Sequence, residues 1–399
     1  MRDYSRLAST AFSRAHTAIT ALVVGAGALG NEVVKNLALL GVTAVWIADR
    51  DRIERSNLTR SILYCTRDID DQIARGVAKA VFAAERVREI NPDVRVTPFV
   101  GEVADLGLGV LRRADVVFSC LDNEMARLEL SWACTRLRKL LVDGGLGLIN
   151  YSSGQVSVFP PEDGPCYACR KTADRRRRLL QELHGREDPC WLKEDRIEAA
   201  EGVATTPIMA SIVGAWQVEI ALRRLQADNS DTLGHAYRIT LHPAPSLDSN
   251  VFERNPTCPL HEPESVVRAI EECREGRSDT WTMRDLLQRY GRAGSYVLLD
   301  WPITAQAACR NCGHMWEPMI RRARFRRAHC PSCGGADLAE TDVLTSVSAE
   351  SPWAGRTLAD LGLPRGHVYE IGTDPPADGE RTHVEMTGDL VADEVANPC

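Results

Sequence analysis

The chain has 399 residues, of which 44% are hydrophobic and 26% are charged, and its formal net charge at pH 7 is −7. This length is typical of two or three domains, and the apolar content is sufficient for a sizeable core. The net negative charge gives no electrostatic case for nucleic acid as the main partner. The sequence has neither an apolar run approaching the roughly 20 residues of a membrane helix nor a signal peptide at its N-terminus, so we expect a cytoplasmic protein without a membrane partner.

The first part of the chain alternates between short apolar runs and amphipathic segments. Strands are predicted at 21–24, 44–48, 94–99, 114–119 and 140–143, and helices at 31–40, 70–90 and 123–137. This alternation predicts an α/β domain with a doubly wound, mostly parallel, Rossmann-like sheet covered by helices on both faces. Residues 151–159 favour an antiparallel extension of the sheet, and residues 207–225 favour a long apolar helix.

Composition divides the chain into a large first domain and several smaller segments. The first domain is placed at residues 1–262, with a charged crossover loop at about 170–201. We interpret this loop as a mobile segment or lid, although its four arginines at 175–178 also fit a solvated helix face. A charged helical linker is predicted over 263–298, beginning with a helical segment at 264–277. A small zinc-ribbon β domain is then expected at 299–340 and a β-containing segment at 341–399.

A glycine loop follows the first predicted strand and opens the first predicted helix. Its glycines are Gly25, Gly27 and Gly30, and Asp49 lies 19 residues beyond the last of them, at the end of the next strand. Such a loop lets backbone N–H groups and a helix N-terminus approach phosphate, while the acid accepts hydrogen bonds from ribose. Taken alone, this pattern fits NAD as readily as ATP.

Further residues resemble a particular family, in the right order along the chain. They are Asn57 and Arg60, Lys79 ahead of an Ile-Asn-Pro stop at 90–92, residues 120–123 with Arg127, residues 165–169, Gly202 and Val203, Pro207, Gln217, Glu219, and residues 254–258. Over about residues 4–261 the chain therefore resembles the ubiquitin-activating and sulfur-carrier adenylyltransferase superfamily, here with an appended C-terminal zinc ribbon. An NAD-dependent oxidoreductase is disfavoured by Asn57, Arg60 and Lys79.

The resemblance implies an enzyme that uses ATP and Mg²⁺ to adenylate the C-terminal glycine carboxylate of a small ubiquitin-like or sulfur-carrier protein. By matching position, Asp49 would hold the ribose, Asn57 and Arg60 the triphosphate, Lys79 a phosphate, and Asp122 the Mg²⁺ ion. These residue types suit the chemistry, because an anionic carboxylate must attack an anionic phosphate and a hard cation prefers carboxylate oxygen.

The resemblance also implies a homodimer in which an N-terminal arginine reaches the partner's triphosphate. Arg6 matches that arginine, although its spacer to Gly25 is shorter than usual, and the alternatives are Arg14 or a purely structural role for Arg6. Two further departures are Ser61, where the family has glutamine, and a longer stretch between Arg60 and Lys79. They leave the reaction type intact but leave the details of the substrate open.

Eight of the chain's potential metal ligands fall into four pairs at ligand spacing. Cys166 and Cys169 with Cys258 and His261 match the family's structural zinc site, with histidine in place of the usual last cysteine. The remaining two pairs are each followed by glycine and predict a zinc ribbon, which would hold a second structural zinc ion. The ligands of this ion would be Cys309, Cys312, Cys330 and Cys333.

Family members that transfer their cargo use a cysteine in the crossover loop, and Cys190 lies in the corresponding region. The predicted function is therefore adenylation with release of pyrophosphate, followed, if Cys190 is the nucleophile, by a thioester and by transfer to a conjugating or sulfur-transfer protein. Two alternatives stay open: adenylation of a peptide or tRNA-bound carboxylate, and an inactive scaffold that pairs with an active family member.

Overall fold

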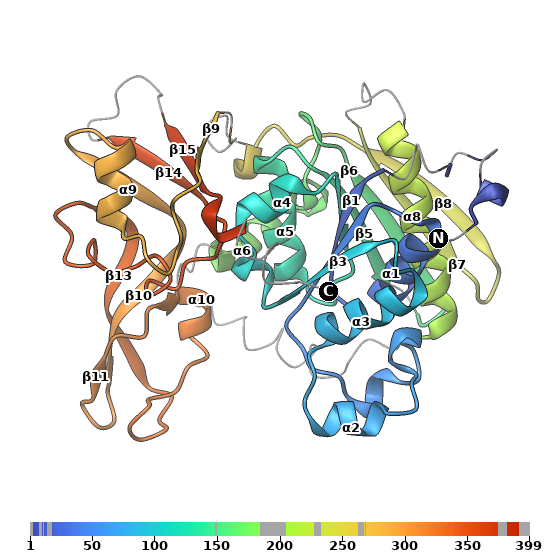
Figure 1. Cartoon of the computed structure of the whole chain (residues 1–399), viewed down its shortest axis with the longest axis horizontal. Helices are drawn as coiled ribbons and strands as arrows, with labels where there is room; N and C mark the ends of the chain where they lie inside the picture. The colour runs from blue at the N-terminus through green and yellow to red at the C-terminus, as the bar shows by residue number, and fades with distance from the viewer. Residues whose placement is uncertain are drawn as a thin grey trace. The chain divides into compact units, whose positions relative to one another are not determined.

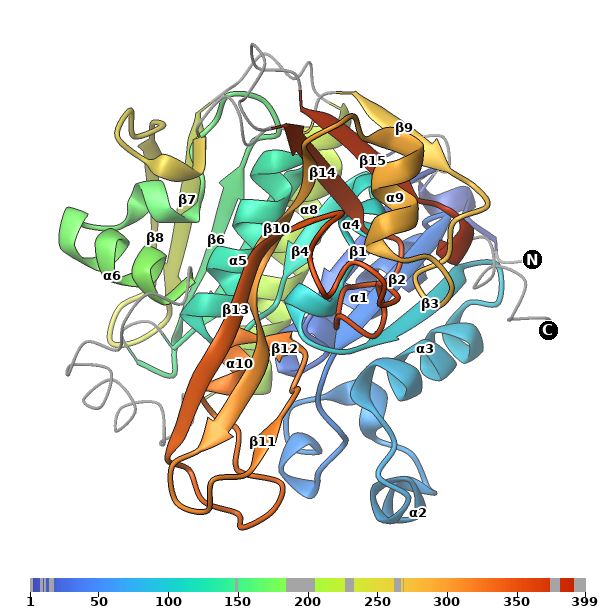
Figure 2. The same cartoon turned by 90° about the vertical axis from the view of Figure 1, so that its left-hand side faces the viewer.

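The computed structural model describes residues 3–7, 10, 12–13, 18–147, 150–183, 205–226, 233–261, 267, 269–373 and 381–390. It divides into two compact units, drawn in Figures 1 and 2. The first comprises Met1–Ala104, Leu111–Thr172 and Cys190–Val266; the second comprises Asp105–Val110, Ala173–Pro189 and Val267–Cys399. In the described part of the chain, no helix combines the length and the apolar character needed to span a membrane. A cytoplasmic location stays a prediction.

The first unit is built on an eight-stranded sheet with the order β3-β2-β1-β4-β5-β6-β7-β8. Strands β1 to β5 pair in parallel, and β6, β7 and β8 continue the sheet in antiparallel fashion. The bounds are β1 Thr20–Val24, β2 Ala44–Asp49, β3 Arg95–Val100, β4 Val116–Ser119, β5 Leu140–Leu146, β6 Ser153–Phe159, β7 Gly234–Thr240 and β8 Ser246–Phe252. The predicted doubly wound, mostly parallel sheet with an antiparallel extension is confirmed.

Helices cover both faces of this sheet. Successive side chains of a strand point to opposite faces. In β5, Gly144 faces Gln217 of α8 and Leu29 of α1, whereas Asp143 bonds Arg127 of α5, so α5 lies opposite the other two helices. The helices of the first unit are α1 Ala28–Leu40, α2 Ile69–Ala74, α3 Lys79–Ile90, α5 Glu124–Arg136 and α8 Pro207–Gln226, and α4 Leu108–Arg113 spans the boundary between the two units in the chain. Short 3-10 turns are η1 Ser5–Leu7, η3 Arg55–Asn57, η4 Ile62–Tyr64, η5 Val103–Asp105, η6 Tyr167–Arg170 and η7 Pro259–His261.

Two helical predictions in the first 204 residues need correction. The single helix expected over 70–90 is two helices, because the chain turns between α2 and α3 at Gly76, whose φ is +63°. The expected loop at 170–201 begins with a helix, α6 Ala173–Leu183, which buries Leu179 and Leu183 one turn apart and also buries Arg176 of the arginine run. Residues 184–204 lie outside the described residues.

The second unit has a seven-stranded sheet of its own, with the order β11-β10-β14-β15-β9 and with β12 and β13 also paired to β10. Its core contains Met283, Leu286, Trp353 and Tyr369. The strands are β9 Ile270–Cys273, β10 Ser295–Cys309, β11 Met315–Trp316, β12 Ile320–Arg321, β13 Leu338–Ser348, β14 Val368–Thr373 and β15 Thr382–Met386, with helices α9 Met283–Tyr290 and α10 Arg322–Phe325.

The predicted helical linker at 263–298 is wrong for its first part. Residues expected to form a helix at 264–277 contain β9, which pairs in parallel with β15 and buries Cys273 in the core. The helix comes later, at α9, where Thr282 and Asp285 form a capping box. The boundary placed between 298 and 299 falls inside β10, so the ribbon and the C-terminal strands share one continuous sheet.

Candidate active site

The predicted nucleotide residues follow the carboxyl ends of neighbouring parallel strands. The glycine loop follows β1, Asp49 ends β2, and Asp122 follows β4. Strand β1 lies between β2 and β4, and from it the strand order runs in two opposite directions. Ligands of open α/β sheets bind at such a switch point, outside the carboxyl ends of the strands. The sheet therefore brings these predicted residues to one edge.

The three loop glycines have different surroundings. Gly25 has φ +96°, and a Cβ there would lie 2.5 Å from the carbonyl oxygen of Cys120. A Cβ on Gly30 would lie 1.8 Å from the carbonyl oxygen of Gly25. A Cβ on Gly27 would meet no described atom within 4 Å, and no side chain caps the N-terminus of α1 beside it. Open space at an uncapped helix N-terminus fits a phosphate group.

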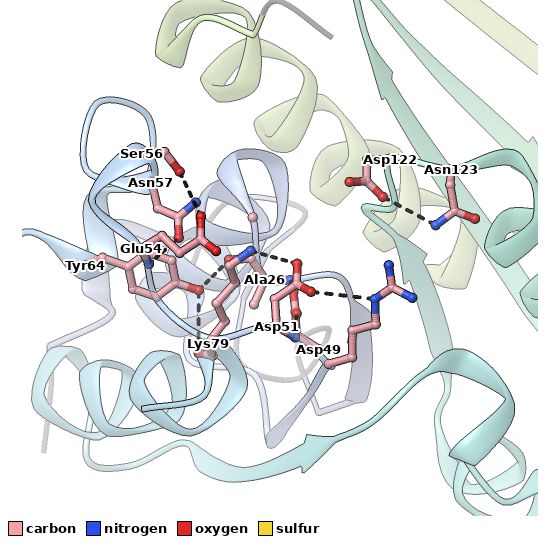
Figure 3. A network of polar contacts seen from close by, with 12 residues as sticks. Ala26, Asp49, Asp51, Glu54, Ser56, Asn57, Tyr64, Lys79, Asp122 and Asn123 are labelled. Atoms are coloured by element: carbon pink, nitrogen blue, oxygen red, sulfur yellow. Dashed lines mark hydrogen bonds and ion pairs between the residues drawn. The ribbon is translucent and has the colours of Figure 1, made fainter. Parts of the chain in front are cut away.

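Asp49 is held against this loop. Its Oδ2 accepts a hydrogen bond from the Ala26 N–H at 2.6 Å, and its Oδ1 accepts one from the Asp51 N–H at 2.7 Å (Figure 3). Burial raises the pKa of Asp49, and the two backbone hydrogen bonds act in the opposite direction. Each carboxylate oxygen can accept more than one hydrogen bond, so the Asp49 carboxylate can also accept from ribose hydroxyls.

Two polar residues that the sequence analysis did not single out shape the loop. Asn31 donates to the carbonyl oxygens of Ala26 and Gly27 at 2.8 and 3.0 Å and accepts from the Leu63 N–H at 2.8 Å. The Tyr64 hydroxyl donates to the Ala26 carbonyl oxygen at 2.5 Å (Figure 3). The position of Asn31 directly after Gly30, in the first turn of the helix that the loop opens, is a local signal for it; Tyr64 has no comparable local signal.

The predicted triphosphate residues lie around short turns after β2. Asn57 is buried in η3, and its Oδ1 accepts from the Glu54 N–H at 3.0 Å. Arg60 donates to the Ser56 carbonyl oxygen at 2.9 Å. Lys79 begins α3, and its ammonium lies 2.9 Å from a carboxylate oxygen of Asp51 (Figure 3).

The N-terminal segment is anchored away from the glycine loop. Tyr4 contacts Gly41 at the C-terminal end of α1, and its hydroxyl accepts a hydrogen bond from Asn91 at 2.7 Å. The 13-residue helix α1 is about 20 Å long, and the loop is at its other end. Arg6 is exposed on η1, and nothing in the described residues brings it to the loop of its own chain. Arg14 and Cys190 lie outside the described residues.

Asp122 is exposed in the loop between β4 and α5, and polar contacts behind it hold that loop. Asn123 caps α5 by accepting from the Ala126 N–H at 2.8 Å. Arg127 donates to the carbonyl oxygen of Leu121 and pairs with the buried carboxylate of Asp143. The motif residue Gln217 donates to backbone carbonyl oxygens of β4 and β5, at Ser119 and Val142, at 3.1 and 3.0 Å.

The first cysteine set forms a compact group of four ligands. Sγ of Cys166 is 3.7 Å from Sγ of both Cys169 and Cys258, and Sγ of Cys169 is 3.2 Å from Nε2 of His261. Tetrahedral zinc with Zn–S bonds of about 2.3 Å separates its sulfur ligands by about 3.8 Å. This donor set therefore fits a closed structural zinc ion that links η6 to η7.

The second set lies in the β10–β13 region of the second unit. Sγ atoms are 3.6 Å apart for Cys309 and Cys333 and 3.7 Å apart for Cys312 and Cys330. The glycine that follows each Cys-x-x-Cys pair has a positive φ: the Gly313 N–H donates to the carbonyl oxygen of Cys309, and the Gly334 N–H donates to that of Cys330. Four thiolates with this spacing fit a second zinc ion.

Similarity to known proteins identifies the family to which this chain belongs. The model of the ThiF family matches residues 4–260. The chain belongs to the ThiF family. Its relatives include the sulfur carrier protein adenylyltransferase of Thermus thermophilus, 31% identical over 62% of this chain and 84% of that protein. The SAMP-activating enzyme E1 of Haloferax volcanii is 38% identical over 37% of this chain and 52% of that protein.

Among solved structures, E. coli MccB with MccA-N7isoASN is 19% identical to this ThiF family member, with a TM-score of 0.49 over 63% of this chain and 68% of that one. The predicted superfamily and enzyme class, an ATP-dependent adenylyltransferase of the ubiquitin-activating type, are confirmed by the family match and the named relatives. The match ends at residue 260, before the second cysteine set.

Proposed function

We propose that the chain adenylates the C-terminal glycine carboxylate of a small ubiquitin-like or sulfur-carrier protein, giving an acyl-adenylate and pyrophosphate. The observation that carries this proposal is the convergence of the glycine loop, Asp49 and Asp122 at one edge of the sheet in a ThiF family chain. The substrate class is that of relatives named as sulfur-carrier, ThiS and SUMO-activating enzymes.

In the proposed reaction, a carboxylate oxygen of the carrier attacks the α-phosphorus of ATP. The bond from that phosphorus to the bridging oxygen breaks, and pyrophosphate leaves with the electron pair. Asp49 binds the ribose, and the N-terminus of α1 at Gly27 faces phosphate. Asn57, Arg60 and Lys79 neutralise and orient the triphosphate, which reduces the repulsion between two anions. Asp122 would hold Mg²⁺, which when bound offsets charge on the phosphates.

The ion pair between Lys79 and Asp51 supports this role for Lys79. Among the described residues, the ion-pair partner of this partly buried ammonium is an exposed carboxylate, and such a partner can be exchanged for phosphate at little cost. Arg6 would act on the partner's triphosphate in a homodimer, consistent with the anchoring of Tyr4 far from the glycine loop of its own chain.

A second step is proposed at Cys190. Its thiolate would attack the acyl carbon, a thioester would form, and AMP would leave; a conjugating or sulfur-transfer protein would then accept the carrier. Incubation with ATP and a carrier would give a thiol-sensitive adduct, and peptide mass spectrometry would locate it. An adduct on another cysteine, or none in the presence of acyl-adenylate, would rule out Cys190 as the nucleophile.

The first step is tested by exchange of labelled pyrophosphate into ATP in the presence of β-grasp carriers that end in glycine. Exchange should depend on one of these carriers, and Asp122→Asn should lower it by about 100-fold or more, because the variant loses a charged Mg²⁺ ligand. Melting temperature and zinc content should match the wild type. Undiminished exchange in Asp122→Asn would refute the assignment of the site.

A further inference from the structure

A small pocket lies on the antiparallel extension of the first-unit sheet, outside the nucleotide residues. It has a volume of about 160 Å³, and its described lining is Gln155, Arg170, Ala236, Arg238, Asn250 and Phe252. Paired residues of neighbouring strands share a face, and the register places Gln155 opposite Arg238 and Ala236 opposite Asn250. Tyr237, which points to the other face, packs on Trp216 of α8. The pocket therefore lies on the face of the sheet away from α8.

Arg170 reaches this face from η6 and is held there by neutral groups. Its guanidinium donates to the Ser157 hydroxyl and, with the Gln155 amide assigned so that its oxygen faces Arg170, donates to that oxygen at 2.9 and 3.1 Å. Its Cζ lies 5.1 Å from the ring centroid of Phe252, a cation–π distance. Burial lowers the pKa of Arg170, and Asp143, the carboxylate that opposes this shift, is already bound by Arg127 and Ser119.

Arg238 is the second cation of the pocket. Its Nε is buried and has no hydrogen-bond partner in the described part of the chain. Its cross-strand neighbour on β8 is Asp248, but the described residues contain no ion pair between them, and Asp248 does not line the pocket. Two guanidiniums thus lie in one pocket whose described lining holds no acid. A buried donor without an acceptor is costly, so this arrangement favours an anionic ligand.

The lining and the volume of the pocket indicate which anion it would take. Planar guanidiniums bind carboxylates through paired, charge-assisted hydrogen bonds, and the Asn250 amide adds a neutral polar group at the wall. A volume of 160 Å³ corresponds to about five water molecules at about 30 Å³ each. That space accommodates a carboxylate on a short aliphatic stem.

We propose that this pocket receives an acidic side chain of the protein substrate. The inference rests on the proposed function. Besides the complementary charge, it is supported by β8, the edge strand beside the pocket, whose residues are exposed from Ser246 to Val251. An open edge next to a positively charged pocket offers a protein partner both backbone and side-chain contacts.

The first experiment tests the ligand chemistry on the full-length protein with glutarate as the probe. Phenylglyoxal modifies accessible arginines, and peptide mass spectrometry measures the rate at Arg238 and, in the same digest, at Arg223, an exposed arginine of α8 paired with Glu219. Glutarate should slow modification of Arg238 and not of Arg223, and Arg170→Gln should remove this protection. An equal effect of glutarate on the modification rates of Arg238 and Arg223 would overturn the site, and stronger protection by inorganic phosphate would overturn its assignment to carboxylate.

The second experiment uses carrier-dependent pyrophosphate exchange to test whether the carboxylate belongs to the carrier protein. Arg238→Gln should raise the KM for the carrier by about tenfold and leave kcat and the KM for ATP unchanged, because only a docking contact is lost. Arg223→Gln is the matched control. Arg238→Glu should be rescued by a carrier in which one acidic residue is replaced by lysine.

The outcomes of the two experiments separate the pocket from the proposed function. An unchanged KM for the carrier in Arg238→Gln would overturn the protein-substrate assignment, and protection by glutarate would then identify a free carboxylate as the ligand. If no carrier supports exchange by the wild type, the proposed function fails, while protection at Arg238 still decides whether the pocket binds carboxylate. Melting temperature and zinc content check the fold of each variant.

Discussion

At the residue scale, one loop contains glycines that are required for different physical reasons. Gly25 needs a positive φ, and Gly30 needs close contact with the backbone of Gly25. Gly27 has neither constraint: its φ is −73°, and the space beside it is open to any added Cβ. The first two glycines therefore serve the fold, and Gly27 is the one whose missing side chain leaves room for a ligand.

This difference predicts opposite behaviour of two alanine variants. Gly27→Ala should keep the wild-type melting temperature and raise the KM for ATP by about tenfold, because the methyl group occupies the space of a phosphate. Gly30→Ala should lose roughly 2 kcal/mol or more of folding free energy, because its Cβ would overlap the Gly25 carbonyl oxygen. Denaturant unfolding and nucleotide kinetics measure the two effects. A normal KM in a well-folded Gly27→Ala would contradict this account.

Asp49 predicts a pH dependence of nucleotide binding. Burial raises its pKa, so this carboxylate takes up a proton at a higher pH than an ordinary aspartate. When the pH falls from about 8 to about 5, the KM for ATP should rise, because a protonated Asp49 is a weaker acceptor for ribose. Asp49→Asn should have a raised KM with a flatter profile. The same profile in both proteins would assign the titration to another group.

At the element scale, the first cysteine set supports the helix that follows Asp122. The backbone N–H of Tyr167 in η6 donates to the Ser131 hydroxyl of α5 at 2.9 Å, and Lys171 pairs with Glu124 in the first turn of α5 at 2.6 Å. This cysteine set, the proposed zinc clip, therefore packs directly on the helix whose N-terminus adjoins Asp122, the proposed Mg²⁺ ligand.

Loss of one ligand from this clip should consequently affect both stability and catalysis. Cys258→Ser should lower the zinc content by one ion per chain and the melting temperature by roughly 5 °C or more, from a loss of about 2 kcal/mol at about 2–4 °C per kcal/mol. Carrier-dependent exchange should fall in the same variant, because α5 loses its support. Elemental analysis and calorimetry provide the readouts. Full exchange activity in a zinc-depleted Cys258→Ser protein would show that the position of Asp122 does not depend on the zinc clip.

At the scale of the whole molecule, the ThiF family match and the second unit are almost complementary. The match covers residues 4–260, whereas the second unit from Val267 onward has its own sheet, core and cysteine set. The chemistry of adenylation is therefore expected to reside in the first unit, and the second zinc ion is expected to be structural.

Disruption of the ribbon tests whether adenylation is confined to the first unit. Cys312→Ser should reduce the zinc content by one ion per chain, as Cys258→Ser does, but change pyrophosphate exchange by less than about twofold. Cys258→Ser is thus the matched control, with the same chemical change at the other site. Loss of exchange in a folded Cys312→Ser protein would mean that the ribbon takes part in the reaction.

Patterns that are local in the chain were predicted well. The glycine loop, the acid at the end of the second strand and the Cys-x-x-Cys pairs are recognisable because a turn, a strand end or a zinc knuckle needs particular residues at a short, definite spacing. The parallel sheet followed in the same way from alternating apolar runs, and it placed Asp49 and Asp122 at one edge because parallel strands share their direction.

The tertiary structure decided what depends on residues far apart in the chain. Charge patterning suggested a helix around Ile270–Cys273, but β15, more than 100 residues later, supplies a strand partner, and Cys273 fills a core. Likewise, the contacts of Tyr64 and Asn31 with the glycine loop, and the gathering of Arg170 and Arg238 in one pocket, arise only on folding. Local spacing encodes turns and ligand pairs, whereas strand partners and buried polar contacts are selected by packing across the whole fold.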